Sequence, residues 1–345
     1  MPMVARLLRA CVASVLVLVP IVAHAATPTA SPPGDGTRVF SPSDEARARP
    51  KKPTITYWTV TVSMEVDPTT EPASVRMLVP VSDGRQAILG PTVRPSAFRF
   101  REEAGPPNQW VSWDAGSVKP HKGTIAYTYT ARTTDVWLDV PRIPLPPPEP
   151  EALAASETMQ SDDPMVQGRA HALTRDATRL DEIVWSLYQY AASFLRSEST
   201  DAPDDARSVL AAERGSPSGR ARLLVALMRS AGIPARLVGG LRLEDAARKR
   251  ATLSWVEAWL GGKWVPFDPS NGHYATLPAN YLALYYGDLP LIEHTAKLGF
   301  SYDILIHQVT RQALLAQEAE SPETALGRGR EVNLETERVK TYAFY

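Results

Sequence analysis

The stretch from Ser216 to Asp268 constrains the fold more than any other part of the chain. Ser216 is a favourable helix N-cap, and Pro217 suits the first helical position because its missing N–H would have no helical partner there. Apolar residues then recur at helical spacing until Gly232 and Pro234, residue types that end helices. Two short apolar runs and an aspartate follow. The stretch therefore predicts a buried helix followed by antiparallel strands.

The residues after this helix carry strand and turn signals. Residues 235–243 predict a strand, in which Gly239-Gly240 indicates a bulge or a close backbone approach. The runs 255–260 and 263–267 flank a Gly-Gly pair, which is a favoured two-residue hairpin turn. The hairpin would place Asp268 directly after its second strand.

An earlier region, residues 54–140, has the period-two alternation of β-strands. From Trp58 to Val66 every second residue is apolar, and Ile125, Tyr127 and Tyr129 alternate with polar residues in the same way. About 90 residues is an ordinary size for one domain. We expect a small antiparallel β-sandwich here, and an α+β fold for the whole chain.

Proline-rich segments separate these regions, and the 31 prolines cluster near 28–53 and 141–150. The predicted division is a signal peptide at 1–25, a flexible linker at 26–53, the β-sandwich at 54–140, a Pro-rich linker at 141–154, a helix-containing domain at 155–310 and a polar tail at 311–345. Three aromatic residues within the tail's last stretch, 334–345, indicate that this piece docks on the folded part.

The first 25 residues have the composition of a secretory signal. Arg6 and Arg9 precede an apolar run that ends at Ala23, and Ala23-His24-Ala25 fits a cleavage site. An uncleaved membrane anchor is the alternative. We expect an exported protein, periplasmic or secreted, whose mature form lacks the chain's one cysteine, Cys11. Such a protein has no disulfide and no thiol nucleophile.

The charge balance argues against a nucleic-acid partner. The chain has 37 basic and 38 acidic residues and a formal net charge of −1, whereas nucleic-acid binding needs a basic excess or patch. No cofactor motif occurs, since Gly239-Gly240 is not followed by a phosphate-loop Lys. We expect no cofactor.

Several segments in the second domain share the motifs of a known family. Residues 160–308 resemble the bacterial transglutaminase-like family, which has a papain-like fold, and they resemble its exported branch, which is related to inactive transglutaminase domains. The matching pieces are Gly215, Ala221, Leu223, Gly232 to Arg236, Trp255 to Glu257, and Trp264 to Pro269.

The resemblance implies a Cys-His-Asp triad, but two of its members are replaced. Counting from the matched motifs places the cysteine position at Pro217 and the histidine position at Leu253, and only Asp268 remains. Neither replacement can supply a nucleophile or a base. We therefore predict a catalytically inactive domain that binds a protein, a peptide or another envelope component, with a membrane protein of the envelope as one candidate partner.

The predicted binding residues lie around the vestigial triad positions. For Trp255, core packing is the default expectation over a place in a groove, because alternation puts it on one strand face with Trp259. The candidate residues for a binding cleft are Ser216, Ser218, Trp255, Asp268 and His273.

Two other functions remain as alternatives. A divergent hydrolase or acyltransferase would use Ser216 or Ser218 as nucleophile and a non-homologous base such as His273. A metal site would draw on Asp268, His273, Asp288 and His294, but these residues match no known ligand spacing, so we predict no metal.

Overall fold

The computed structural model describes residues 52–118, 123–146, 153–197, 202–245, 252–295 and 297–320. The predicted signal peptide, most of the 26–53 linker and the docking piece at 334–345 lie outside these residues. The described residues all belong to one compact unit. Within the described part, no helix is both long enough and apolar enough to span a membrane.

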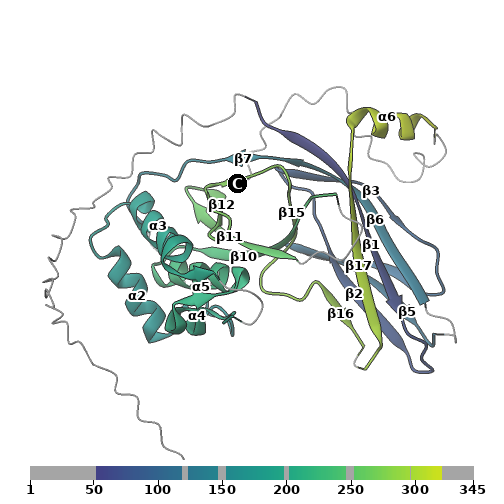
Figure 1. The fold of residues 1–345 in the computed structure, drawn as a ribbon, viewed down its shortest axis with the longest axis horizontal. Coiled ribbons are helices and arrows are strands. Elements are labelled where there is room, and N and C mark those ends of the chain that lie inside the picture. The colour runs from purple at the N-terminus through teal and green to yellow at the C-terminus, as the bar shows by residue number, and fades with distance from the viewer. Residues whose placement is uncertain are drawn as a thin grey trace, which may run out of the picture. The chain divides into compact units, whose positions relative to one another are not determined.

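Two four-stranded antiparallel sheets enclose the first core (Figure 1). One sheet has the order β17-β1-β6-β3 and the other β16-β2-β5-β4. Their strands are β1 (Ile55–Val66), β2 (Ala73–Val79), β3 (Gln86–Val93), β4 (Arg99–Gly105), β5 (Asn108–Ala115), β6 (Gly123–Thr134), β16 (Ile292–His294) and β17 (Phe300–Val309). The alternation along β1 is as predicted: Val60 and Met64 are buried, whereas Thr61 faces outward and bonds Thr128 at 2.9 Å.

The last two strands of the sandwich come from the far end of the chain. In β17, Ile304 lies opposite Val62 of β1, and in β16, Ile292 lies opposite Met77 of β2. The sequence prediction grouped residues 292–309 with the helices, in the segment 155–310. Alternation identifies a strand but not its partner, so pairing over this separation was not visible in the sequence.

A five-stranded antiparallel sheet of order β13-β12-β11-β10-β15 packs against one helix, α5, through β10 and β11. Its strands are β10 (Ala235–Arg242), β11 (Leu253–Leu260), β12 (Lys263–Asp268), β13 (His273–Tyr274) and β15 (Tyr281–Tyr286). The helices are α2 (Pro164–Thr174), α3 (Leu180–Gln189), the π-helix η2 (Tyr190–Phe194), α4 (Ala206–Ala212), α5 (Pro217–Ser230) and α6 (Arg311–Glu320). Short strands complete the list: β7 (Val136–Trp137), β14 (Thr276–Leu277), β8 (Arg196–Ser197) and β9 (Arg214–Gly215). The α+β class with an N-terminal β-rich region is thus confirmed.

Helix α5 begins and ends where the sequence indicates. The Ser216 side chain accepts the N–H of Gly219 at 2.9 Å, and Pro217 is the first helical residue. The helix ends before Gly232, whose φ is +82°. Residues on all sides of α5 are buried, and the helix packs on β10 and β11.

The two glycines of β10 lie at a register shift, as predicted. A Cβ on Gly239 would lie 2.1 Å from the ring of Tyr285, and one on Gly240 would lie 2.3 Å from the carbonyl oxygen of Leu282. Only glycine permits this close approach of β10 to β15.

Side-chain amides of the sandwich bind the backbone of β15. Gln86 donates to the carbonyl of Ala283 and accepts its N–H, both at 2.9 Å. Asn108 does the same with Tyr286, at 2.9 and 2.8 Å. These pairs replace the ladder hydrogen bonds that a further strand would supply, and they fix β15 to the sandwich.

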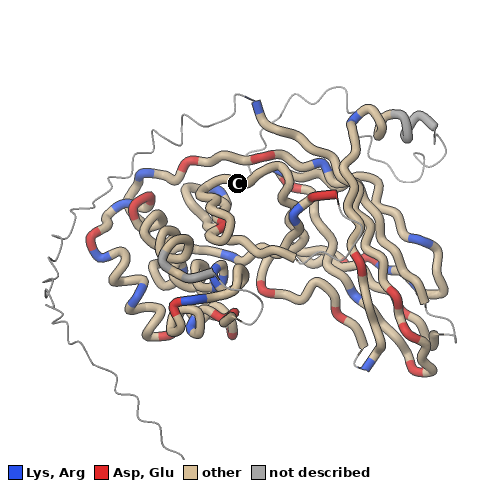
Figure 2. The backbone as a smooth tube through the Cα atoms, in the orientation of Figure 1, with Lys and Arg blue, Asp and Glu red and all other residues tan. Residues whose placement is uncertain are grey.

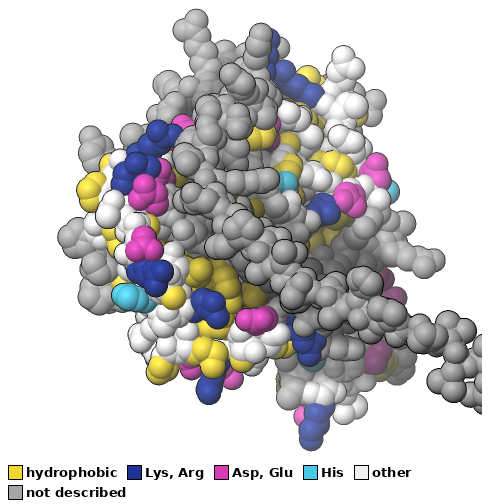
Figure 3. Space-filling model, turned by 60° about the vertical axis from the view of Figure 1, so that its left-hand side comes forward, with side chains coloured by type: hydrophobic (Ala, Val, Ile, Leu, Met, Phe, Trp, Pro, Cys, Tyr) yellow, Lys and Arg dark blue, Asp and Glu magenta, His cyan; other side chains and the backbone are white. Residues whose placement is uncertain are grey.

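Acidic and basic residues are interspersed along the chain in both the sandwich and the helical part (Figure 2). On the side shown in Figure 3, charged side chains of both signs lie among apolar ones.

Candidate functional site

Asp268 ends β12 and is wholly buried, with four hydrogen-bond donors around its carboxylate. Its Oδ1 accepts the backbone N–H groups of Ser270 at 2.9 Å and Asn271 at 3.1 Å. Its Oδ2 accepts the Asn271 side-chain amide at 2.7 Å and the Tyr281 hydroxyl at 2.9 Å. A carboxylate can be buried when its oxygens are satisfied in this way. Its partner is therefore a phenol rather than an imidazole.

The phenol that binds Asp268 is itself held by an arginine. Arg242 and Tyr281 face each other across β10 and β15, and Arg242 Nη2 lies 3.3 Å from the Tyr281 hydroxyl. The same nitrogen donates to Asn271 Oδ1 at 2.6 Å. Burial raises the pKa of Tyr281, and the nearby Asp268 charge raises it further. The hydroxyl is thus protonated at neutral pH and donates to Asp268.

The first turn of α5 lies beside this carboxylate. The hydroxyl of Ser270 donates to the carbonyl of Pro217 at 3.3 Å, which places Pro217 next to the loop that follows Asp268. Pro217 is exposed and Ser218 is half-buried. The predicted nucleophile position and the retained acid are thus neighbours, as the family resemblance implies.

Ser216 is occupied by structural hydrogen bonds. Its oxygen caps α5 by accepting from Gly219, and its hydroxyl donates to Oδ1 of Asp204. Asp204 in turn binds Arg222, which also forms a two-point ion pair with Asp288 at 3.1 and 2.9 Å. A serine whose proton is directed to a carboxylate in an ion-pair network is not activated by an imidazole.

Leu253 begins β11 opposite Gly240 and belongs to an apolar cluster. It packs with Trp255 and Tyr281, whose rings are 5.7 Å apart at 70°. Trp255 is wholly buried, so in this conformation it packs in the core and does not line an open surface. The position where the family places its imidazole is therefore apolar.

His273 lies opposite Asp268 in the short β12–β13 pairing. Its ring is 5.4 Å from that of Tyr281 at 83°. Burial lowers the pKa of His273, against the effect of Asp268, and the charge of Arg242 lowers it further. The imidazole is neutral at pH 7. Within the described part of the chain, no hydrogen bond joins His273 to Ser216 or Ser218.

Arg220 is a residue of this site that the sequence did not indicate. It lies on α5 with 4% of its surface exposed, and it donates to the carbonyls of Ala191, Ala192 and Pro269 at 3.0, 2.5 and 3.2 Å. Burial lowers the pKa of Arg220, and Asp268 opposes that change. The guanidinium ties α5 to η2 and to the loop after Asp268.

The other candidate ligands for a metal are dispersed. His294 and His307 are exposed in the sandwich, and Asp288 is held by Arg222. Among residues 52–118, 123–146, 153–197, 202–245, 252–295 and 297–320, no group of three or more His, Cys, Asp or Glu side chains could hold a metal ion.

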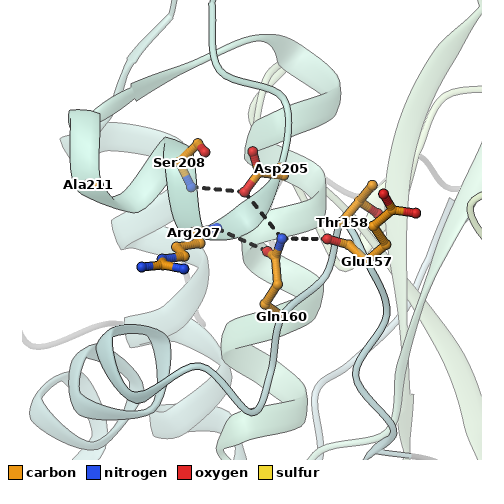
Figure 4. A pocket seen from close by; sticks show the side chains of 7 residues that line it. All are labelled: Glu157, Thr158, Gln160, Asp205, Arg207, Ser208 and Ala211. Atoms are coloured by element: carbon orange, nitrogen blue, oxygen red, sulfur yellow. Dashed lines mark hydrogen bonds between the residues drawn. The ribbon is translucent and has the colours of Figure 1, made fainter.

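Two cavities lie near the site. The first, of about 460 Å³, is lined by Glu157, Thr158, Gln160, Asp205, Arg207, Ser208 and Ala211 (Figure 4). Its Gln160 amide is fully engaged, since it donates to Asp205 at 3.3 Å and accepts the N–H of Arg207 at 3.1 Å. The second, of about 380 Å³, includes Thr252, the neighbour of Leu253.

Comparison with known proteins agrees with this geometry. A structure from Cytophaga hutchinsonii, described as a candidate cysteine protease, has a TM-score of 0.59 and 16% identity, covering 75% of this chain and 93% of that one. The periplasmic domain of TgpA from Pseudomonas aeruginosa has 15% identity over 61% of this chain and 87% of its own, with a TM-score of 0.30, which is too low to support an inference. No curated protein matches the chain. Residues 165–269 match the family model of the Transglutaminase-like superfamily. The chain therefore carries a transglutaminase-like domain.

Proposed function

We propose that this chain is a non-catalytic transglutaminase-like protein that binds a protein or peptide. One observation carries the proposal: the retained acid, Asp268, is bound to Tyr281, while Pro217 and Leu253 occupy the other two triad positions. The acid holds a phenol in place, and among the described residues its carboxylate bonds Ser270, Asn271 and Tyr281 rather than an imidazole.

The chemistry of the family cannot be assembled from these side chains. Acyl transfer by this fold needs a thiolate and an imidazole that accepts and returns its proton. Proline has no nucleophilic atom, leucine has no titratable group, and Tyr281 stays protonated at neutral pH because its pKa is raised. Substitution at these positions leaves the scaffold stable, since Pro217 suits the first turn of α5.

Buried side-chain hydrogen bonds hold the framework around the predicted triad positions in place. Arg220 fixes α5 to the loop after Asp268, and Gln86 fixes β15 to the sandwich. A rigid framework is what a recognition surface needs, because less ordering free energy is lost on binding. The partly exposed Ser218 and His273, and the 380 Å³ cavity next to Leu253, are the surfaces offered to a ligand.

Export belongs to the same proposal. The support is the composition of residues 1–25, with Arg6 and Arg9 before an apolar run and an Ala23-His24-Ala25 cleavage pattern. An exported binding module would meet a peptide or envelope component, including a membrane protein, outside the cytoplasm.

A direct assay separates a binding module from an enzyme. The full chain is incubated with a fluorescent primary amine and a glutamine-containing acceptor protein, and separately with peptide substrates. We expect no amine incorporation and no cleavage above the buffer control. Turnover at rates typical of enzymes, about 1 s⁻¹ or more, would refute the proposal.

The serine-hydrolase alternative has its own test. Ser216 donates its proton to Asp204, so we expect no labelling of Ser216 or Ser218 by a fluorophosphonate probe. Labelling of either serine that disappears in the His273→Ala variant would instead establish a serine enzyme.

A further inference from the structure

The cavity of about 380 Å³ is a groove where three segments meet. Thr252 precedes β11, the segment from Tyr285 to Leu291 follows β15, and the remaining residues come from β16 and β17. The lining residues are Thr252, Tyr285, Leu289, Pro290, Leu291, Ile292, His294, Phe300 and Tyr302.

Most described residues that line the groove have aliphatic or aromatic side chains, although polar atoms make up the larger part of its exposed surface. The rings of His294 and Phe300 stack at 5.2 Å, and those of Phe300 and Tyr302 stack at 6.0 Å. Leu289 leaves 36% of its surface exposed. Among the lining residues that the structure describes, none is Asp, Glu, Lys or Arg. Such a lining favours an aromatic or aliphatic side chain that brings no charge with it.

We propose that this groove is occupied by the chain's own segment 341–345, Thr-Tyr-Ala-Phe-Tyr. The segment matches the lining: it has three aromatic side chains and no Asp, Glu, Lys or Arg. The preceding stretch, 321–340, contains four acidic and four basic residues. It is therefore too highly charged to fit this groove. Moving an aromatic ring of the segment from water into the space beside Leu289 and Phe300 lowers the free energy of the chain.

The chain is long enough for this contact. The groove lies at the first residues of β17, and the described chain ends at Glu320, after ten residues of β17 and ten of α6. The groove and Glu320 are then at most about 50 Å apart, at about 3.3 Å per strand residue and 1.5 Å per helix residue. The 21 residues from Glu320 to Thr341 extend to about 70 Å at roughly 3.3 Å per residue.

Tethering makes even a weak contact significant. A covalent connection of this length holds the segment at an effective concentration of about 1 mM, so a contact with a Kd near that value is substantially occupied. The segment can occupy the groove whether or not the proposed function is correct. If the protein binds a partner through this groove, as the proposed function implies, that partner must displace the segment.

Disulfide formation in the full chain tests the occupancy. Cys11 is replaced by Ser, and Leu289→Cys is combined with Phe344→Cys. The matched control combines Met165→Cys with Phe344→Cys, because Met165 is also exposed, at 47%, but lies on α2. We expect the Leu289 pair to form an intrachain disulfide about tenfold faster than the control, as measured on non-reducing gels and by mass spectrometry. Equal rates would overturn the proposal, and so would a bond that forms only between chains.

Competition shows whether the aromatic side chains drive the contact. A synthetic peptide of residues 334–345 in excess should slow the disulfide of the Leu289 pair, whereas the same peptide with its three aromatics replaced by Ser should not. If both peptides act alike, the segment does not occupy the groove through its aromatic side chains. If the Leu289 pair forms its disulfide faster than the control but no external partner is found, the docking of the segment is supported and the proposed function is contradicted.

Discussion

The hydroxyl of Tyr281 donates to Oδ2 of Asp268 at 2.9 Å, 13 residues further along the chain than the acid it binds. Asp268 is the residue that the family resemblance matches to the triad acid, and it is wholly buried. The bond changes the role of the acid. It anchors β15 to the end of β12 and does not orient a base.

The Tyr281→Phe variant should lose stability. Phenylalanine fills the same space but leaves one donor fewer at a buried carboxylate, and such a loss costs about 1–3 kcal/mol. Urea unfolding followed by fluorescence measures the change. Tyr57→Phe is the control, because Tyr57 is only partly buried on β1, and its effect should stay within about 0.5 kcal/mol. Equal effects of the two variants would contradict the role assigned to Tyr281.

Restoring the missing triad residues should not restore activity by itself. In the double variant Pro217→Cys and Leu253→His, the new imidazole would find Asp268 already bonded to Tyr281 and Asn271. We expect no amine incorporation by this double variant. Adding Tyr281→Phe frees one position on Oδ2, so any turnover should appear first in the triple variant. Activity in the double variant would show that Tyr281 yields readily to an imidazole.

The loss of Arg220 should be more costly than that of an exposed arginine. Arg220→Ala leaves three carbonyls, those of Ala191, Ala192 and Pro269, without their donor. Unsatisfied buried groups cost about 1–3 kcal/mol each before the site relaxes, so we expect a loss of about 3 kcal/mol or more. Denaturant unfolding gives the value. The control is Arg207→Ala on α4, where the side chain is 65% exposed and the change should be under about 1 kcal/mol.

How far the sequence determines these features depends on whether the relevant contacts are local. The Ser216 cap of α5 and the glycine bulge of β10 follow from rules within a few residues, and both were predicted. The bond from Tyr281 to Asp268, the carbonyl cage of Arg220 and the pairing of β17 with β1 depend on segments far apart in the chain. No periodicity or cap signal encodes such contacts. The sequence therefore did not distinguish Arg220 from an ordinary helix residue.

Stability should depend on pH through His273. Burial lowers the folded-state pKa of His273 below its ordinary value near 6.5. Between pH 6.5 and the folded-state pKa the unfolded chain therefore binds more protons than the folded chain. Stability falls as the pH falls through this range and levels off below the folded-state pKa. We expect the urea midpoint to drop more between pH 7.5 and about 5 in the wild type than in His273→Asn. His171→Asn, at an exposed site on α2, should leave the wild-type slope unchanged. Parallel pH curves for the wild type and His273→Asn would contradict this assignment.

Gln86 should be needed to hold β15 against the sandwich. It is 2% exposed, and its amide donates to the carbonyls of Val81 and Ala283 and accepts the N–H of Ala283. Gln86→Ala leaves all three groups unpaired and should cost about 2–4 kcal/mol.

Gln86→Glu separates the accepting role of this side chain from its donating role. A carboxylate at position 86 accepts the N–H of Ala283 but faces the carbonyls of Val81 and Ala283 with no proton, which raises its pKa. The variant should thus be destabilised at pH 7.5 and regain stability relative to the wild type toward pH 5, where the carboxyl is protonated and donates one bond. Urea unfolding at both pH values measures this. A loss of stability that is the same at both pH values would mean that the packing of Gln86, and not the hydrogen bonds of its side-chain amide, is important.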